Sequence, residues 1–195
     1  MVKNYTSKQL LDRVKSLPSF KEIPLGHWIL AVRSDEDIFN TFDDKYYLFK
    51  GEQFILVGTC TTNPGGPSLL GGFKRYKQKG SAVIKADEWY YQVYRYGLHN
   101  GKMPALKQTK SMKYFRDGNI DKKVDEVGTI IEGNFSTNFH FNSYKVFDGI
   151  KNAISNIIGE WSHGCIVANE EDKYEKVITL TKDEPSVSVC LIKEF

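Results

Sequence analysis

The spacing of apolar and polar residues predicts one helix at the start of the chain and mostly strands after it. Residues 6–17 carry leucines and a valine on one helical face, Thr6 or Ser7 can cap the first turn, and Pro18 ends the run. From Gly26 onward the apolar residues come in short runs that are typical of strands. We therefore expect residues 1–25 to form a helical extension of a single domain that spans residues 1–195.

Seven segments are predicted to be strands because they are short apolar runs or alternate between apolar and polar residues. They are His27–Arg33, Lys45–Lys50, Gln53–Thr62, Ser81–Lys85, Ala105–Asp117, Thr129–Phe141 and Ser186–Lys193. Gly51-Glu52 predicts a hairpin between the second and third of these strands. Gln53–Thr62 is apolar on both faces, as in a strand at the centre of a sandwich or barrel.

Four other segments have weaker or different patterns. Thr62–Gly72 is rich in Gly and Pro and predicts a loop long enough to frame a site, whereas Asp87–Leu98 follows no single period. Isoleucines and an alanine between residues 150 and 158 are compatible with a helical stripe. Glu170–Leu180 predicts a helix that buries Tyr174, Val177 and Ile178, with Asn169 as its cap.

Composition and charge describe a folded protein and exclude some classes of function. The chain has 195 residues, of which 41% are hydrophobic and 13% aromatic, enough for one domain with a sizeable core. The formal net charge is only +3 and the lysines are spread along the chain, so we expect no nucleic-acid partner. No apolar run is long enough for a membrane helix, and we expect no membrane insertion.

The first residues also lack the apolar region of a signal peptide. We therefore expect synthesis in the cytoplasm. Action at a cell wall would then require assisted export or cell lysis.

The cysteines are few and have different surroundings. Their number is odd and they lie far apart, which argues against a disulfide framework. Cys60 and Cys190 lie in apolar segments and are predicted to be buried thiols. Cys165 instead follows a glycine in a predicted turn, and Gly164 allows the backbone to approach a ligand closely.

A cysteine nucleophile needs a base nearby in space, and two histidines are candidates. His163 lies two residues before Cys165, and His140 lies between two phenylalanines. Either imidazole could lower the pKa of the thiol. His140 would lie near Cys165 if a strand that ends near His140 runs beside the turn.

The residues around Cys165 resemble a known family. Ser162-His163-Gly164-Cys165, followed by Ile166, is similar to the Ser/Thr-His-Gly-Cys signature of the L,D-transpeptidase catalytic domain. The resemblance is closest to phage-type relatives with a Trp-Ser-x-Gly-Cys core. It extends over about residues 55–180 and includes the stretches Thr61–Gly65, Gly97–Lys102 and Phe115–Asn119. It implies a mainly β fold, similar to a sandwich or barrel, with flanking α-helices.

The resemblance also implies catalytic roles for five residues of the chain. Cys165 would be the nucleophile and His140 the base, with its ring oriented by the carbonyl of Phe141 or Asn142. The family places this histidine about twenty residues before the cysteine, and here the interval is longer. His163 would pack behind the turn and Ser162 would hydrogen-bond within the site. The amides of Gly164 and Cys165 would hold the oxyanion.

Other residues bear on substrate and metal binding. His99, Lys102 and Trp161 are expected to line a substrate groove. Many family members have Arg or Asn two residues after the cysteine, where this chain has Val167. Zinc held by His140, His163 and Cys165 is the rival chemistry, but the chain has no His-Glu-x-x-His pattern. We expect neither a metal nor a cofactor.

The expected function is acyl transfer from a peptidoglycan stem peptide to Cys165. Water as the acceptor would make the protein an L,D-carboxypeptidase or endopeptidase of the endolysin type, and we favour this hydrolysis over cross-linking. An L,D-transpeptidase that uses an amine is one alternative. A non-catalytic phage structural or wall-binding protein with the same fold is another. The sequence does not specify the oligomeric state.

Overall fold

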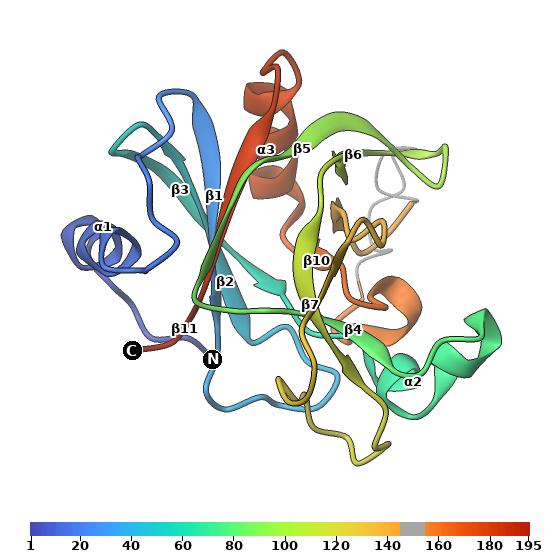
Figure 1. The fold of residues 1–195 in the computed structure, drawn as a ribbon. Coiled ribbons are helices and arrows are strands. Elements are labelled where there is room, and N and C mark those ends of the chain that lie inside the picture. Colours follow the sequence, from blue (N-terminus) through green and yellow to red (C-terminus); the bar gives the residue numbers. More distant parts are fainter. Residues whose placement is uncertain (145–154) are drawn as a thin grey trace.

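A computed structural model describes residues 1–144 and 155–195, and its main feature is a closed ring of eight strands (Figure 1). The order around the ring is β1-β11-β5-β6-β9-β10-β3-β2. The ring strands are β1 (His27–Arg33), β2 (Asp44–Lys50), β3 (Gln53–Thr61), β5 (Glu88–His99), β6 (Met103–Gln108), β9 (Phe139–Phe141), β10 (Ile166–Ala168) and β11 (Val187–Lys193).

Two parallel pairs interrupt an otherwise antiparallel ring. β1 runs parallel to β11, and β9 runs parallel to β10. A second, smaller sheet has the order β4-β7-β8 and is formed by β4 (Ser81–Ile84), β7 (Met112–Asp117) and β8 (Ile131–Gly133). Both of its pairings are antiparallel.

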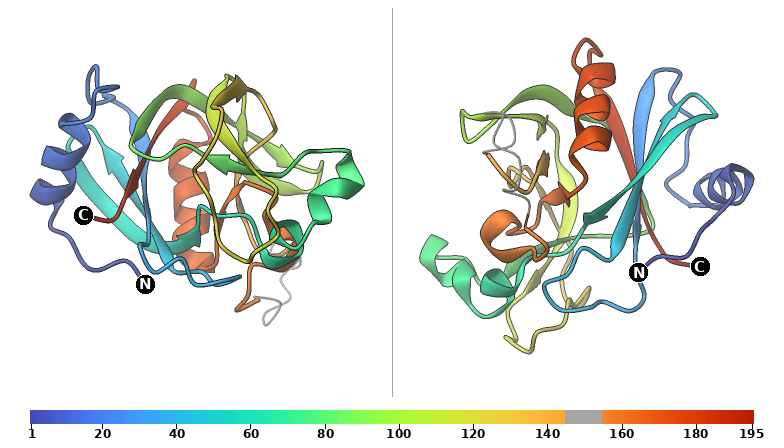
Figure 2. Two further views of the ribbon diagram at one scale, coloured as in Figure 1. Left: turned by 60° about the horizontal axis from the view of Figure 1, so that its bottom comes forward. Right: turned by 180° about the vertical axis from the view of Figure 1, so that it is seen from behind.

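The helices are short and lie outside the ring or against its edge. They are α1 (Ser7–Lys15), α2 (Gly66–Leu69) and α3 (Glu171–Thr181), with 3-10 turns η1 (Gly72–Tyr76) and η3 (Gly159–Trp161). α1 and α2 lie at opposite ends of the molecule, and α3 lies between them (Figure 2). None of the helices in the described parts of the chain is long and apolar enough to cross a membrane.

Side chains on both faces of β1, β2 and β11 are buried, which explains their nearly continuous apolar sequences. One face contributes Ile29, Leu48 and Val189 to the main core inside the ring. The opposite face contributes residues such as Trp28 and Ile192 to a second core outside it, which α1 covers. The N-terminal extension therefore packs on the outer face of the ring.

α3 covers the part of the ring where the strands are shortest. The helix contacts β3 and β6, which lie on either side of β9 and β10. Its buried residues Tyr174, Val177 and Ile178 join the main core, as the sequence predicted. The Tyr174 hydroxyl also donates a hydrogen bond to the Pro104 carbonyl on β6 (2.5 Å).

The structure confirms the expected fold class, mainly β with flanking helices, and most of the predicted elements. β1, the β2–β3 hairpin, β4, β11 and helices α1 and α3 all form within a few residues of the predicted boundaries. Cys60 and Cys190 are fully buried, as expected. The unassigned segment Asp87–Leu98 is β5, a twelve-residue strand. Its register with β11 shifts at a bulge, which explains the lack of a single period.

Two strand predictions were wrong because each segment serves two sheets. Ala105–Asp117 is divided between β6 in the ring and β7 in the small sheet, with Thr109 at the bend donating to the Val93 carbonyl (2.8 Å). Thr129–Phe141 is likewise divided between β8 and β9. Continuous β-type composition hides such a break, because strand-forming residues occur on both sides of it.

Two smaller predictions also need correction. Asn169 does not cap α3: Glu170 holds that position, and the Asn169 side chain hydrogen-bonds to the Thr59 hydroxyl. The predicted loop Thr62–Gly72 contains the short helix α2. Most of the suggested helical stripe at 150–158 lies outside the described residues, and Ile157 forms an isolated bridge with Thr41.

The cap of α1 provides a stability test that leaves the rest of the fold untouched. Thr6 and Gln9 form a capping box, in which each side chain accepts a hydrogen bond from the backbone of the other. We expect Thr6→Ala to lower the free energy of unfolding by about 1 kcal/mol, measured by chemical denaturation. Ser7→Ala, which removes a hydroxyl outside the box, is the control. Equal losses from both changes would contradict the assigned cap.

Candidate active site

The pairing of β9 with β10 brings Cys165 and His140 to the same face of the ring. Phe139 and Phe141 of β9, like Ile166 and Ala168 of β10, point into the main core. Because side chains alternate along a strand, His140 and its partner Val167 point outward. Cys165, two residues before Val167, lies on this outer face and packs against the small cluster that contains Val167.

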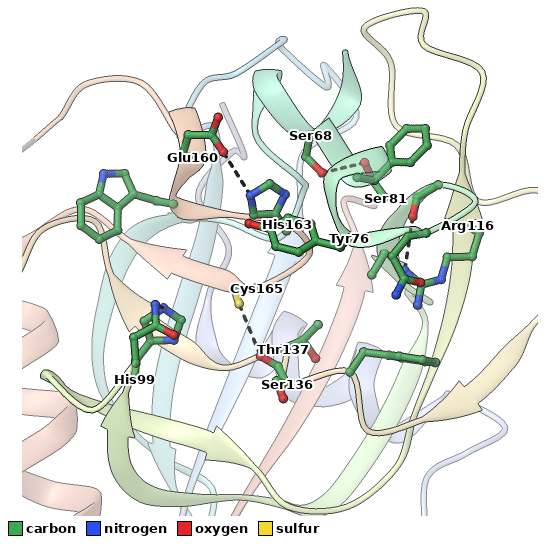
Figure 3. A pocket seen from close by; sticks show the side chains of 17 residues that line it. Ser68, Tyr76, Ser81, His99, Arg116, Ser136, Thr137, Glu160, His163 and Cys165 are labelled. Carbon is green, nitrogen blue, oxygen red and sulfur yellow. Dashed lines mark hydrogen bonds and ion pairs between the residues drawn. The ribbon is translucent and has the colours of Figure 1, made fainter. Parts of the chain in front are cut away.

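Cys165 opens into a cleft of about 480 Å³ (Figure 3). Its walls come from α2, η1, β4, the end of β5, β7, the segment before β9 and the turn that precedes Cys165. The lining residues are Ser68, Phe73, Tyr76, Gln78, Gly80, Ser81, Ala82, His99, Asn100, Arg116, Phe135, Ser136, Thr137, Glu160, Trp161, His163 and Cys165. This volume is in the usual range for small-molecule and peptide side-chain sites.

The turn before Cys165 is held by Ser162. The buried Ser162 hydroxyl donates to the Cys165 carbonyl (2.9 Å) and accepts from the Gly164 amide (3.2 Å). The Ser162 carbonyl accepts from the Gly65 amide (2.8 Å), which ties the turn to the start of α2. Ser162 therefore hydrogen-bonds within the site, as the resemblance implied.

Gly164 is required by both conformation and space. Its φ of +130° is a value that residues with a side chain rarely adopt. A Cβ built at this position would lie 2.5 Å from the Ala82 carbonyl oxygen. The Gly164 amide is already bonded to Ser162, so the prediction that it helps to hold an oxyanion needs correction. The Cys165 amide has no hydrogen-bond partner among the described residues and is the better candidate.

His140 is completely buried, and its hydrogen bonds define its tautomer. Nδ1 lies 2.7 Å from the Phe141 carbonyl oxygen, which can only accept, so Nδ1 carries the proton. Nε2 is thus left with a lone pair. It forms no hydrogen bond of good geometry within the described parts of the chain, although the Trp161 carbonyl lies close to the ring. Burial and the neighbouring His99 lower the pKa of His140 to about 3, although the carbonyls of Phe141 and Trp161 raise it in part.

His99 covers His140 on the side of the cleft. The two rings stack with centroids 3.9 Å apart and planes 19° from parallel. Burial, and to a lesser degree Lys107, lower the pKa of His99. His99 lines the cleft whereas His140 does not, so His99 separates the buried imidazole from solvent.

The hydrogen bonds of Asn138 show that His99 is also neutral. The Gln108 amide donates to Asn138 Oδ1 (2.9 Å), so the other end of this side chain is the NH₂ group. That group lies 3.0 Å from Nδ1 of His99, which must accept. His99 therefore carries its proton on Nε2. The Asn100 amide 3.1 Å away can accept that proton only with its oxygen, not its NH₂ group, turned toward the ring.

Gln108 organises the irregular segment that runs below the sulfur. Its Oε1 accepts hydrogen bonds from the amides of Phe135 (3.2 Å) and Thr137 (3.0 Å), and its Nε2 donates to the Gly133 carbonyl (3.1 Å). These bonds replace the strand ladder that residues 134–138 lack. The ordered segment presents the Asn138 amide 3.4 Å from Sγ of Cys165 and the Ser136 carbonyl 3.8 Å from it.

The thiol and the imidazole are both uncharged at rest. Burial raises the pKa of Cys165 to about 11, and the Asn138 amide offsets only part of this rise. His140 has a pKa of about 3. A thiolate and an imidazolium in contact would attract each other by about 4 kcal/mol, which equals about three pKa units. This is less than the difference between the pKa values of Cys165 and His140, so the proton stays on the sulfur. The expectation that two imidazoles lower the pKa of the thiol therefore needs correction.

His163 lies elsewhere than predicted. It lines the cleft instead of packing behind the turn, and its Nε2 is 3.2 Å from a carboxylate oxygen of Glu160. Its ring meets Tyr76 edge-on, with centroids 5.3 Å apart. His163 thus contributes a polar wall to the cleft.

The structure distinguishes among the predicted substrate-binding residues. Trp161 and His99 line the cleft, as expected. Lys102 is exposed on the turn after β5 and does not line the cleft; its Nζ lies 5.7 Å from the Tyr144 ring. Val167 is fully buried against Phe42 and Ile158, so it cannot contact a substrate.

Sequence reasoning missed three residues of the site: Gln108, Asn138 and Arg116. Asn138 precedes β9 and carried a weak signal, being polar beside an apolar strand. Gln108 and Arg116 lie in predicted strands, where a polar residue is usually assigned to the solvent-facing side. No group of three potential metal ligands occurs within residues 1–144 and 155–195.

Comparison of the chain with protein-family models, curated proteins and solved structures gives no match.

Replacing Gly164 tests whether the turn needs a residue without a side chain. We expect Gly164→Ala to destabilise the fold and to slow alkylation of Cys165, because the new Cβ collides with Ala82. Gly128→Ala is the matched control, since Gly128 also has a positive φ (+87°) but a Cβ added there would meet no atom within 4 Å. Gly164→Ala should cost about 1–3 kcal/mol more in denaturation than the control. Equal costs would contradict the close approach.

The pH dependence of alkylation tests the neutral pair. Only the thiolate reacts, so with a pKa of about 11 the rate of Cys165 labelling by iodoacetamide should rise about tenfold per pH unit between pH 7 and 10. Cys60 and Cys190 are fully buried, and burial raises both pKa values, so they should label more slowly. Peptide mapping measures all three. A rate plateau between pH 5 and 8 that disappears in His140→Gln would show a charged pair instead.

Proposed function

We propose that this protein is a cysteine enzyme that transfers an acyl group from a peptidoglycan stem peptide to Cys165 and then to water. One observation carries the proposal: a buried imidazole with an unpartnered Nε2 lies on the strand beside a cysteine that faces a cleft. An unprotonated ring nitrogen that makes no hydrogen bond of good geometry is free to accept a proton.

The first step is attack of Sγ of Cys165 on an amide carbonyl carbon. The thiol proton moves to Nε2 of His140 as the C–S bond forms, because neither residue is charged beforehand. At rest Sγ contacts the Asn138 amide and the Ser136 carbonyl and is not hydrogen-bonded to Nε2, so the step requires the sulfur to turn toward the ring. Nδ1 of His140 keeps its bond to the Phe141 carbonyl and stabilises the imidazolium. The oxyanion develops on the substrate oxygen next to the carbon that Sγ attacks. The backbone amide of Cys165 itself is the proposed hydrogen-bond donor to this oxygen.

The second step releases the amine and leaves a thioester. His140 returns its proton to the leaving nitrogen as the C–N bond breaks. A water molecule then attacks the thioester carbonyl, His140 accepts a proton from it, and the carboxylic acid leaves as the thiol is restored. Atoms and protons balance without a metal or a cofactor.

The substrate class rests on the sequence signature, and the cleft is consistent with it. The Ser-His-Gly-Cys turn resembles that of enzymes acting on stem peptides, and the cleft has both apolar walls, such as Phe73 and Trp161, and polar ones. Water is proposed as the acceptor because the cleft is open to solvent. The buried Val167 also cannot provide the polar contact that Arg or Asn gives at this position in many members of the family that the signature resembles.

The proposed reaction predicts cleavage of purified muropeptides that depends on Cys165. Incubation with the protein should yield peptides that have lost an amino acid or been split, as detected by mass spectrometry. Cys165→Ala should abolish cleavage and leave thermal unfolding nearly unchanged, because the sulfur is partly exposed and makes only weak hydrogen bonds. Cys190→Ala, which removes a buried thiol of the outer core, is the control and should still cleave.

Two outcomes would overturn this proposal in different ways. Dimeric muropeptides without cleaved monomers would show that an amine is the acceptor. No conversion of any peptidoglycan fragment by the folded protein would favour the non-catalytic alternative.

A further inference from the structure

Arg116 is the cation of the cleft that the proposed reaction does not use. Arg13, Arg33 and Arg75 each form an ion pair with a carboxylate, and Arg95 is exposed to solvent. Arg116 is half-buried in the cleft, and no carboxylate of the described residues pairs with it. A guanidinium kept partly out of water without a counter-ion is costly unless a ligand provides one.

Two contacts position the Arg116 guanidinium, and its other N–H donors have no hydrogen bond among the described residues. Nη1 donates a weak hydrogen bond to the Gly80 carbonyl (3.3 Å), and the group stacks on the Phe135 ring, 4.5 Å from its centroid. Stacking covers a face of the planar group, whereas its N–H donors point outward from the edges. This geometry suits a carboxylate, which two parallel N–H groups can bind together.

The other charged groups that line the cleft are arranged apart from Arg116. Glu160 is paired with both His163 and Arg75, so its charge is already balanced. In Figure 3, Arg116 lies at the end of the pocket away from His99, with Cys165 between them. A peptide with its scissile carbonyl at Cys165 therefore has a positive site beside one of its ends.

We propose that Arg116 binds a carboxylate of the peptide substrate, so that the cleft selects acidic peptides. This inference rests on the proposed function for its substrate class. The carboxylate can belong to the C-terminal residue or to a side chain, because both present the same two oxygens. A C-terminal carboxylate would make the reaction the removal of a terminal residue, whereas a side-chain carboxylate would also allow internal cleavage.

Binding to the Cys165→Ala protein tests the proposal without turnover. The probes are three forms of one stem tetrapeptide: unmodified, with the C-terminal carboxylate converted to an amide, and with the side-chain carboxylates converted to amides. Calorimetry should show that one of the two amide forms binds about tenfold or more weakly than the unmodified peptide, since a charge-assisted bidentate contact is lost. The form that weakens identifies which carboxylate Arg116 holds.

The double variant Cys165→Ala, Arg116→Gln should bind all three forms equally weakly. Arg95→Gln in the same background is the matched control, with the same change of charge at an exposed site, and should keep the full preference. If Arg116→Gln impairs folding, Arg116→Lys retains the charge without the planar fork and should lose part of the preference. The proposal is overturned if the preference is the same with and without Arg116, or if no form of the peptide binds.

Failure of this proposal is distinguishable from failure of the proposed function. Binding that depends on Arg116, together with no cleavage by the unmodified protein, would retain the carboxylate site and reject acyl transfer. Cleavage by the unmodified protein, together with peptide binding that does not depend on Arg116, would retain acyl transfer and reject the carboxylate site.

Discussion

The site depends on the parallel pairing of β9 with β10. Three residue pairs bring two segments of distant sequence into one register, and this register places His140 and Cys165 on the outer face of the ring. A shift by one residue would turn His140 into the main core and bring the phenylalanines out. The apolar residues that flank His140 therefore fix the direction of the imidazole as much as they stabilise the ring.

Parallel strands also explain the interval between the histidine and the cysteine. A parallel pair needs a crossover connection of about a dozen residues or more, whereas an antiparallel pair can be joined by a tight turn. The connection from β9 to β10 is such a crossover, and extra length in a connection costs little free energy. The longer spacing of His140 and Cys165 is thus compatible with the geometry that the family resemblance implies.

Around this pair, side-chain hydrogen bonds replace secondary structure and keep the centre of the site uncharged. Gln108 and Asn138 satisfy the backbone of an irregular segment and fix the tautomer of His99. Low pKa values for the stacked histidines and a high one for the thiol have the same origin, because burial disfavours every charged form. Among the described residues that line the cleft, the acidic and guanidinium side chains are Glu160, which pairs with Arg75 where the cleft meets solvent, and Arg116.

The sequence by itself determined the elements with a regular local pattern and the residues with distinctive chemistry. The amphipathic period of α1, the β2–β3 hairpin and the apolar alternation of β11 are local signals, and Cys165 stood out because it follows Gly164 in a turn. The tertiary structure alone decided that Ala105–Asp117 and Thr129–Phe141 each contribute to two sheets. It also decided that Gln108 is buried and that Arg116 faces the cleft. These outcomes depend on contacts between segments far apart in the chain, and a polar residue in a strand carries no local signal of the partner that it will meet.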